Sequence, residues 1–474
     1  MKNYITIIFT ICLLVSSKLM AQSGHKIEFK ITNVKEKQFL LGHYFGADSQ
    51  ILKDTAKLNT DGFYEFSGKN TLPTGQYIIT FGKDKAIELI ITEKEQAFRL
   101  ETDTLSFVNN MKILGSDENT AYYFYLKEMN KFLEEVQIIN LEAQFKKEQV
   151  SKLKLQGIYK NIDQFKRKFV KDNAKLFTSK MIKVSLEPLV PELVRVSLKG
   201  KKDSLSQLLY YYKNHFMDGV DFTEKGLVFT KSLLPKMTRY MNELTYQTAD
   251  SLIKSAENLV QLAKNNQDIQ KYFIYKLASI YERSKIIGGE NVFVHIGRKY
   301  YQGQPQLWDS TTVKKIIGQI DILEPLLVGK IFPNLALADT LGKLVNTNEM
   351  KAKYTFQIFY DPDCSHCKKS APELTKIYPS LKKRGVEYVW VCVVRNPYFW
   401  RKFIRDYHLE AMPNLIDIHL DPITKEESNL VDFQKLDLYA TPVIYVLDQN
   451  KKILAKRLSV NELGAFIDFV EKKK

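Results

Sequence analysis

The most informative stretch of this chain is Phe359-Tyr360-Asp361-Pro362-Asp363-Cys364-Ser365-His366-Cys367. A strand is predicted over Tyr354–Tyr360, followed by a turn and by a helix that starts at Cys364. Unpaired N–H groups and the helix dipole favour a thiolate at such a position, so Cys364 is the expected nucleophile. Cys367 lies about one helical turn further on, close enough to attack a mixed disulfide formed on Cys364.

Strands and helices alternate after this helix, which is expected to end at Lys383. The predicted elements are a strand at Val386–Val394, a helix at Pro397–Tyr407, a hairpin at Val443–Leu447 and Ile453–Lys456, and a closing helix at Val460–Lys472. Such alternation predicts a sheet covered by helices on both faces. Residues 328–474 are therefore predicted to form an α/β domain.

The cysteine pair alone leaves three interpretations open. It could be half of a zinc site, but Cys392 lies in an apolar strand, and His408 and His419 fit no zinc spacing. It could be a structural disulfide, which exported proteins retain. The strand-turn-helix setting favours the third interpretation, a pair that works in thiol–disulfide exchange. Cys392 is expected to be a small buried core residue.

This constellation resembles the thioredoxin superfamily, in particular its exported bacterial TlpA-like disulfide reductases. The resemblance covers roughly residues 328–474 and rests on the Cys364 and Cys367 pair, Lys368, Pro372 and Ala440-Thr441-Pro442. It implies a thioredoxin fold with a cis-proline loop facing the redox pair. Thr441 and Pro442 would hold the substrate chain in an extended pose.

The resemblance also implies a reaction and its partners. Protein thiols or disulfides would exchange with the pair, and electrons would pass to or from a membrane or envelope electron-transfer protein. No metal, flavin or nicotinamide cofactor is implied. A β-rich domain and a helical domain of unknown function precede the thioredoxin domain in a similar multidomain layout.

Three positions depart from the family pattern. Asp363 stands where a tryptophan is common, Ile358 where a buried acid is common, and Ser370 where some members have glutamate. Proton transfer at Cys367 is therefore expected to use another group or water.

Ser365 and His366 are expected to tune the redox pair. An imidazolium at His366 would stabilise the Cys364 thiolate and favour the reduced pair. Asp361 and Asp363 would oppose this effect by repelling the thiolate.

The N-terminus has the layout of a secretory signal peptide, predicted over residues 1–21. Lys2 precedes the apolar run Tyr4–Val15, and Leu19-Met20-Ala21 offers a small residue for cleavage. An uncleaved anchor is the alternative, although the run is short for a membrane span. The chain is thus expected to be exported to the periplasm or cell envelope.

The sequence between these ends predicts two further domains. Residues 22–110 are expected to form a β-sandwich, with a hairpin at Asp61-Gly62. Residues 115–327 are expected to form an all-α domain, because long stretches lack proline and almost lack glycine. His43, near a predicted turn, is expected to be solvated.

The net charge and the length of the chain bear on which functions are expected. The net charge of +16 is spread along 474 residues rather than gathered in one run, so no nucleic acid partner is expected. The favoured function is a cell-envelope thiol–disulfide oxidoreductase. A protein- or glycan-binding platform with a structural disulfide is the alternative. A peroxidase of the peroxiredoxin type is not favoured, because this chain lacks the Pro-x-x-x-Thr-x-x-Cys motif that such an enzyme needs before its reactive cysteine. A homodimer formed through the β-domain is a further hypothesis.

Overall fold

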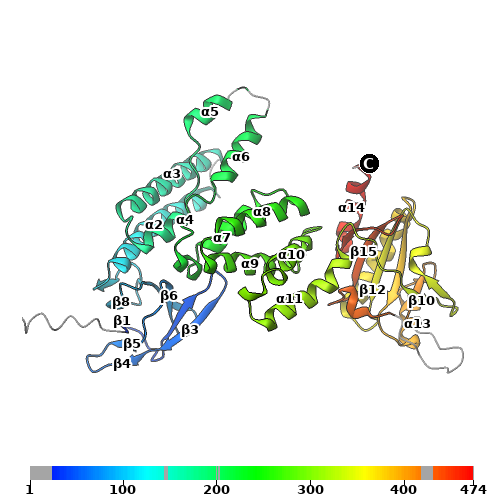
Figure 1. Ribbon diagram of the computed structural model, residues 1–474, viewed down its shortest axis with the longest axis horizontal. Helices are drawn as coiled ribbons and strands as arrows, with labels where there is room; N and C mark the ends of the chain where they lie inside the picture. Colours follow the sequence, from blue (N-terminus) through cyan, green and yellow to red (C-terminus); the bar gives the residue numbers. More distant parts are fainter. Residues whose placement is uncertain (1–23, 144–147, 199, 201–202, 418–430, 473–474) are drawn as a thin grey trace, which may run out of the picture. The chain divides into compact units, whose positions relative to one another are not determined.

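The computed structural model describes residues 24–143, 148–198, 200, 203–417 and 431–472 (Figure 1). It divides into two compact units, Met1–Leu244 with Leu262–Gln270, and Thr245–Gln261 with Lys271–Lys474. The predicted signal peptide lies outside the described residues. None of the helices in the described part of the chain is both long enough and apolar enough to span a membrane.

The first unit opens with two sheets, ordered β4-β5-β1-β8-β9 and β3-β2-β6-β7. Their strands are β1 (His25–Thr32), β2 (Leu40–Tyr44), β3 (Gln50–Thr55), β4 (Lys57–Leu58), β5 (Tyr64–Gly68), β6 (Gly75–Phe81), β7 (Lys85–Ile91), β8 (Ala97–Asp103) and β9 (Lys112–Leu114). Ile27, Phe29 and Ile31 of β1 are buried, as expected for alternate residues on one face. Gly62 supplies the positive φ of 79° in the β4–β5 hairpin turn.

Helices follow the sheets in the first unit. They are α2 (Asp117–Ala143), α3 (Glu148–Asp172), α4 (Phe177–Val184), α5 (Glu192–Leu198), α6 (Ser204–His215) and α7 (Leu233–Asn242). Ser116 caps α2, since its Oγ accepts from Asn119 N at 3.0 Å. The Asn119 side chain bonds both the N–H and the carbonyl of Ile90, which fixes α2 on β7.

The expectation of a solvated His43 was wrong. His43 is 1% exposed, because β2 lies between β3 and β6 and turns this side chain inward. Its ring stacks on Tyr77 at 4.0 Å and on Phe229 at 4.5 Å between ring centroids.

The second unit has a helical part and an α/β part. The helical part comprises α10 (Glu290–Ile296), a π-helix at Gly297–Gln302, α11 (Ser310–Leu323) and portions of α8 (Ala249–Leu262) and α9 (Gln267–Tyr281). Gly297 allows a close approach to α11, because a Cβ there would lie 2.1 Å from Ile320 Cδ1.

The α/β part is built on a seven-stranded sheet ordered β11-β10-β14-β13-β12-β15-β16. Its strands are β10 (Ala336–Ala338), β11 (Leu344–Asn346), β12 (Tyr354–Tyr360), β13 (Val386–Cys392), β14 (Asn414–Ile416), β15 (Val443–Asp448) and β16 (Ile453–Lys456). Its helices are α12 (Ser365–Lys382), α13 (Pro397–Asp406) and α14 (Val460–Lys472). β12 pairs in parallel with β13 and antiparallel with β15.

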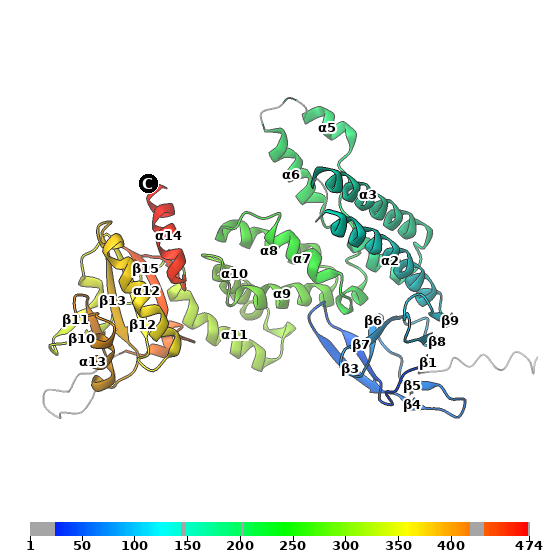
Figure 2. The same ribbon diagram turned by 180° about the vertical axis from the view of Figure 1, so that it is seen from behind.

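Both faces of this sheet are buried. Ile444 and Val446 of β15 join a cluster with residues of α12, α13 and α14, whereas Tyr445 and Leu447 join a second cluster on the opposite face. Figure 2 shows α12 and α14 beside the strands that they cover. The central strands are therefore fully enclosed, and this packing fixes the position of the junction between β12 and α12.

Candidate functional site

Cys364 lies at the junction between the central strand β12 and helix α12. It is the N-cap residue of α12, so the helix begins at Ser365, one residue later than expected. The turn before it is fixed by two hydrogen bonds, from Cys364 N to the Asp361 carbonyl at 3.1 Å and from Asp363 N to Asp361 Oδ1 at 2.8 Å. The Cys364 sulfur is thereby held at the start of α12, where the first backbone N–H groups of the helix have no partner within the helix.

The loop before β15 meets Cys364 from the other side. Antiparallel pairing places Val443 opposite Phe359, so the residues before Val443 lie next to the end of β12. The Thr441–Pro442 peptide bond in this loop is cis. The Cys364 thiol donates to the Thr441 carbonyl at 3.1 Å. The structure thus brings together Cys364, Thr441 and Pro442, which the sequence predicted to share a site.

The two thiols of the pair differ in acidity. Burial opposes ionisation of Cys364, but hydrogen bonds with Thr441, Cys367 and His366 outweigh it, and its pKa lies below the ordinary value. Burial raises the pKa of Cys367 to about 12. All three described cysteines are free thiols. Cys364 is therefore the group suited to attack, and Cys367 the protected second thiol.

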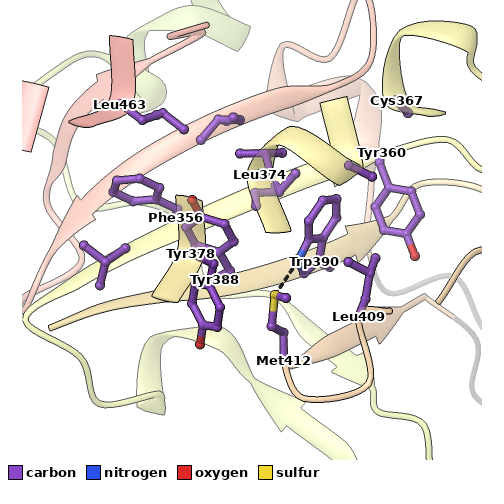
Figure 3. Packing of buried hydrophobic residues seen from close by; sticks show 14 of the residues in the cluster. Phe356, Tyr360, Cys367, Leu374, Tyr378, Tyr388, Trp390, Leu409, Met412 and Leu463 are labelled. Atoms are coloured by element: carbon purple, nitrogen blue, oxygen red, sulfur yellow. Dashed lines mark hydrogen bonds between the residues drawn. The ribbon is translucent and has the colours of Figure 1, made fainter. Parts of the chain in front are cut away.

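Aromatic side chains, rather than a carboxylate, occupy the region beneath Cys367. Tyr360 is fully buried, with its ring centroid 4.6 Å from that of Phe403 and 5.6 Å from that of Trp390. Figure 3 shows Tyr360 and Trp390 within the cluster that also contains Cys367. Burial raises the pKa of Tyr360 well above its ordinary value, so this phenol keeps its proton near neutral pH and cannot take one from Cys367.

The remaining predicted residues flank the pair. The side chains of Ser365 and His366 are exposed in the first turn of α12. Cys392 is buried as predicted; its thiol donates to the Val394 carbonyl at 3.2 Å, and burial raises its pKa to about 12. Cys392 is therefore part of the core and is not poised for nucleophilic attack.

The sequence-based reasoning missed the residues that hold the Thr441 loop. Asp437 begins this loop and is paired with Lys456 and Arg457, which in turn pair with Glu290. These four charges come from segments far apart in the sequence, and no local pattern relates them. Only the tertiary structure could bring them to notice.

The described residues contain no cluster of three or more histidine, cysteine, aspartate or glutamate side chains arranged to hold a metal ion. His408 lies among them, whereas His419 lies outside the described residues.

The C-terminal part of the chain is similar to known proteins. Residues 328–456 match the AhpC/TSA family. The thiol-disulfide oxidoreductase ResA of Bacillus cereus is 30% identical over 94 residues, which are 20% of this chain and 54% of ResA. ResA of Bacillus subtilis is 28% identical over 134 residues, which are 28% of this chain and 67% of that protein.

Among solved structures, a domain of a possible thiol-disulfide isomerase from Cytophaga hutchinsonii is 37% identical, over 31% of this chain and 96% of that one, with a TM-score of 0.28. A thioredoxin-like protein from Bacteroides caccae is 13% identical, over 60% of this chain and 97% of that one, with a TM-score of 0.45.

The family match defines the C-terminal domain as a thioredoxin-like domain, so the thioredoxin-like fold predicted for this part of the chain is confirmed. The curated relatives that it matches are named thiol-disulfide oxidoreductases. This chain spans about half the length of the first of these relatives.

Proposed function

We propose that the C-terminal domain is a thiol–disulfide oxidoreductase that exchanges disulfides with protein partners through Cys364 and Cys367. The observation that carries the proposal is the position of Cys364, at the start of α12 and 3.1 Å from the Thr441 carbonyl beside cis-Pro442. This arrangement joins an acidified thiol to a loop that can hold a substrate chain.

The reaction requires only the two thiols and a partner. In the reducing direction, the Cys364 thiolate attacks one sulfur of a partner disulfide and releases the other as a thiolate. Cys367, after losing its proton, attacks Cys364 and releases the second partner sulfur. One disulfide is then formed in this domain and one is broken in the partner, and the oxidising direction is the reverse.

The loop before β15 is suited to hold the partner. Thr441 and Pro442 are both partly exposed beside Cys364, and they lie next to the end of β12. A substrate strand added here would present its cysteine to the Cys364 sulfur.

The reduction potential of the pair tests the proposal. Equilibration of the protein with glutathione or dithiothreitol buffers, followed by thiol counting by mass spectrometry, is expected to give a value between about −270 and −120 mV, the range of working oxidoreductases. A value well below about −300 mV, or a pair reducible only after unfolding, would favour a binding platform braced by a structural disulfide.

A Cys367→Ser variant is expected to accumulate a mixed disulfide with a protein substrate. Cys364 can still attack, but no second thiol remains to release the complex. Non-reducing electrophoresis after incubation with insulin should show a covalent adduct that dithiothreitol removes. The same adduct should be absent from the double variant C364S/C367S, and its presence there would contradict the assignment of Cys364.

We further propose that the chain is exported to the periplasm or cell envelope, as a member of the TlpA-like branch. The signal-like residues 1–21 and the single close cysteine pair support this proposal. The exchange partner in electron transfer would be a membrane or envelope protein. Cell fractionation together with the N-terminal sequence of the purified protein tests it, and a cytosolic protein that begins at Met1 would contradict it.

The remaining domain assignments stay proposals. The two N-terminal sheets are proposed to form a β-sandwich, and the helices that follow an all-α domain. A homodimer through the β-domain is tested by light scattering, in which a monomeric mass would count against it.

A further inference from the structure

A largely buried charge cluster in the second compact unit consists of Glu290, Asp437, Lys456 and the partly exposed Arg457. Lys456 Nζ lies 2.5 Å from Glu290 Oε2 and 3.4 Å from Asp437 Oδ2. Arg457 lies 2.9 Å from Glu290 Oε1 and pairs with Asp437 Oδ2 as well. The side chains of Glu290 and Lys456 are 6% exposed and that of Asp437 is 0% exposed. The Arg457 side chain is 28% exposed, so two carboxylates and one cation lie away from water and the second cation reaches the surface.

The cluster joins the helical part of the unit to the edge of the thioredoxin-like sheet. Glu290 is the first residue of α10, and Lys456 is the last residue of β16. Asp437 follows the 3-10 helix η7 (Phe433–Leu436) and has a φ of 56°, a left-handed conformation that side-chain-bearing residues seldom adopt. Its ion pairs hold it there, because release would leave a carboxylate buried without a partner.

Asp437 begins the loop that faces the redox pair, which we define as the substrate loop, residues 437–442. The loop leads through Tyr439 to Thr441, whose carbonyl accepts from the Cys364 thiol at 3.1 Å. Arg457 also contacts β15, the strand that follows the loop, since its main-chain N donates to the Ile444 carbonyl at 2.9 Å. Glu290 is therefore linked to Cys364 by the ion pairs that reach Asp437, by the backbone of the loop, and by the hydrogen bond between Cys364 and Thr441.

The helical part also contacts the substrate loop directly. The Arg283 guanidinium, just after α9, lies 4.6 Å from the centroid of the Tyr439 ring, and that of Arg457 lies 5.9 Å from it. Tyr439 is exposed, yet it is flanked by cations from both parts of the unit. The loop is thus supported by residues outside the thioredoxin-like domain itself.

We propose that Glu290 is a positioning residue for the substrate loop, so that the helical part of the chain sets the affinity of the redox site for protein substrates. Glu290 neutralises Lys456 and Arg457, which leaves both cations able to hold Asp437. Without this carboxylate, the buried Lys456 and the partly exposed Arg457 compete for one anion and repel each other. The loop then loses its fixed position over Cys364. This inference rests on the proposed oxidoreductase function.

Glu290→Gln in the full chain is the test, because it removes the charge and keeps the size. The KM for insulin disulfides is expected to rise about tenfold, the change expected when a coupled buried pair is uncoupled. The pH midpoint of Cys364 alkylation by iodoacetamide is expected to rise, because displacement of the loop removes the hydrogen bond of the Thr441 side chain that favours the thiolate. A residue that served only overall stability would move neither readout in a folded variant at 25 °C.

Two further variants sharpen the test. Glu257→Gln removes a carboxylate of the same helical part, paired with His295 at 2.8 Å and with Lys299, and is expected to leave both readouts unchanged. The double variant E290Q/K456M leaves Arg457 and Asp437 as a neutral pair. It is expected to return the KM to within about threefold of the wild type, because removing a buried pair together is often neutral.

The outcomes are distinct. A folded Glu290→Gln variant with wild-type KM and alkylation midpoint would overturn the inference, and so would a double variant worse than the single one. If Glu290→Gln does not fold, the double variant is compared directly with the wild type, and a tenfold higher KM overturns the inference. A wild-type protein whose Cys364–Cys367 pair neither reduces nor oxidises a protein substrate refutes the proposed function instead, while the alkylation midpoints still report on Glu290.

Discussion

Replacing Cys364 by serine is expected to lower the rate of insulin reduction roughly a thousandfold or more, as the loss of a catalytic nucleophile does. A serine hydroxyl is not ionised near neutral pH, whereas the pKa of the Cys364 thiol is lowered, against the effect of burial, by its hydrogen bonds with Thr441, Cys367 and His366. Neither of the other described cysteines can replace it, because burial raises the pKa of Cys367 and of Cys392 to about 12. The measurement is the initial rate of insulin reduction with dithiothreitol as reductant.

Cys392→Ala is the matched control for this variant. It removes a thiol from the same domain, but one that donates only to the Val394 carbonyl within the core. It should retain most of the wild-type rate while lowering the thermal midpoint, because a small cavity remains. A Cys364→Ser variant that kept more than about a tenth of the wild-type rate would show that the nucleophile had been assigned to the wrong residue.

The sequence predicted the C-terminal domain well because its signals are local. The apolar run of β12, the turn at Asp361-Pro362-Asp363 and the start of α12 are adjacent in sequence. Thr441 and Pro442 lie 77 or more residues from Cys364, but they were predicted through their resemblance to a known motif. Antiparallel pairing of β12 with β15 brings Thr441 and Pro442 to the Cys364 sulfur. This pairing is part of the thioredoxin fold that the resemblance implies.

The buried features outside that motif depend on partners that no local pattern can identify. Glu290 and Asp437 are ordinary surface-type residues by composition, and they become buried only because Lys456 and Arg457 are placed between them. In the same way, a histidine near a turn is ordinarily solvated. Phe229, far along the chain, supplies one of the rings that enclose His43. Tertiary contact, rather than sequence spacing, decides burial at these positions.

The burial of His43 predicts that acid destabilises the first unit. Both ring nitrogens are among the buried side-chain atoms without a hydrogen-bond partner in the described part of the chain, and a protonated ring there would be desolvated. Burial, reinforced by repulsion from Lys53, lowers the pKa of His43 to about 3. The unfolded chain binds this proton near pH 6.5, as an ordinary histidine does. The folded unit therefore excludes a proton that the unfolded chain accepts.

The sign and the size of the effect follow from this difference. Between about pH 6.5 and pH 3 the unfolded state holds the extra proton, so the free energy of unfolding falls as the pH falls, by up to about 1.4 kcal/mol per pH unit. At pH 4 the loss from His43 is expected to be about 3 kcal/mol relative to pH 7. Above pH 6.5 both states are neutral at this residue, and no dependence remains.

His43→Phe isolates this contribution from the carboxylates that also titrate in acid. Phenylalanine keeps the stacking on Tyr77 and Phe229 but carries no titratable group. The difference in unfolding free energy between variant and wild type, measured by urea denaturation at several pH values, should grow by about 3 kcal/mol from pH 7 to pH 4. A constant difference for His43→Phe would mean that the imidazole binds its proton equally well in the folded and unfolded chain, and that water reaches the space between the two rings.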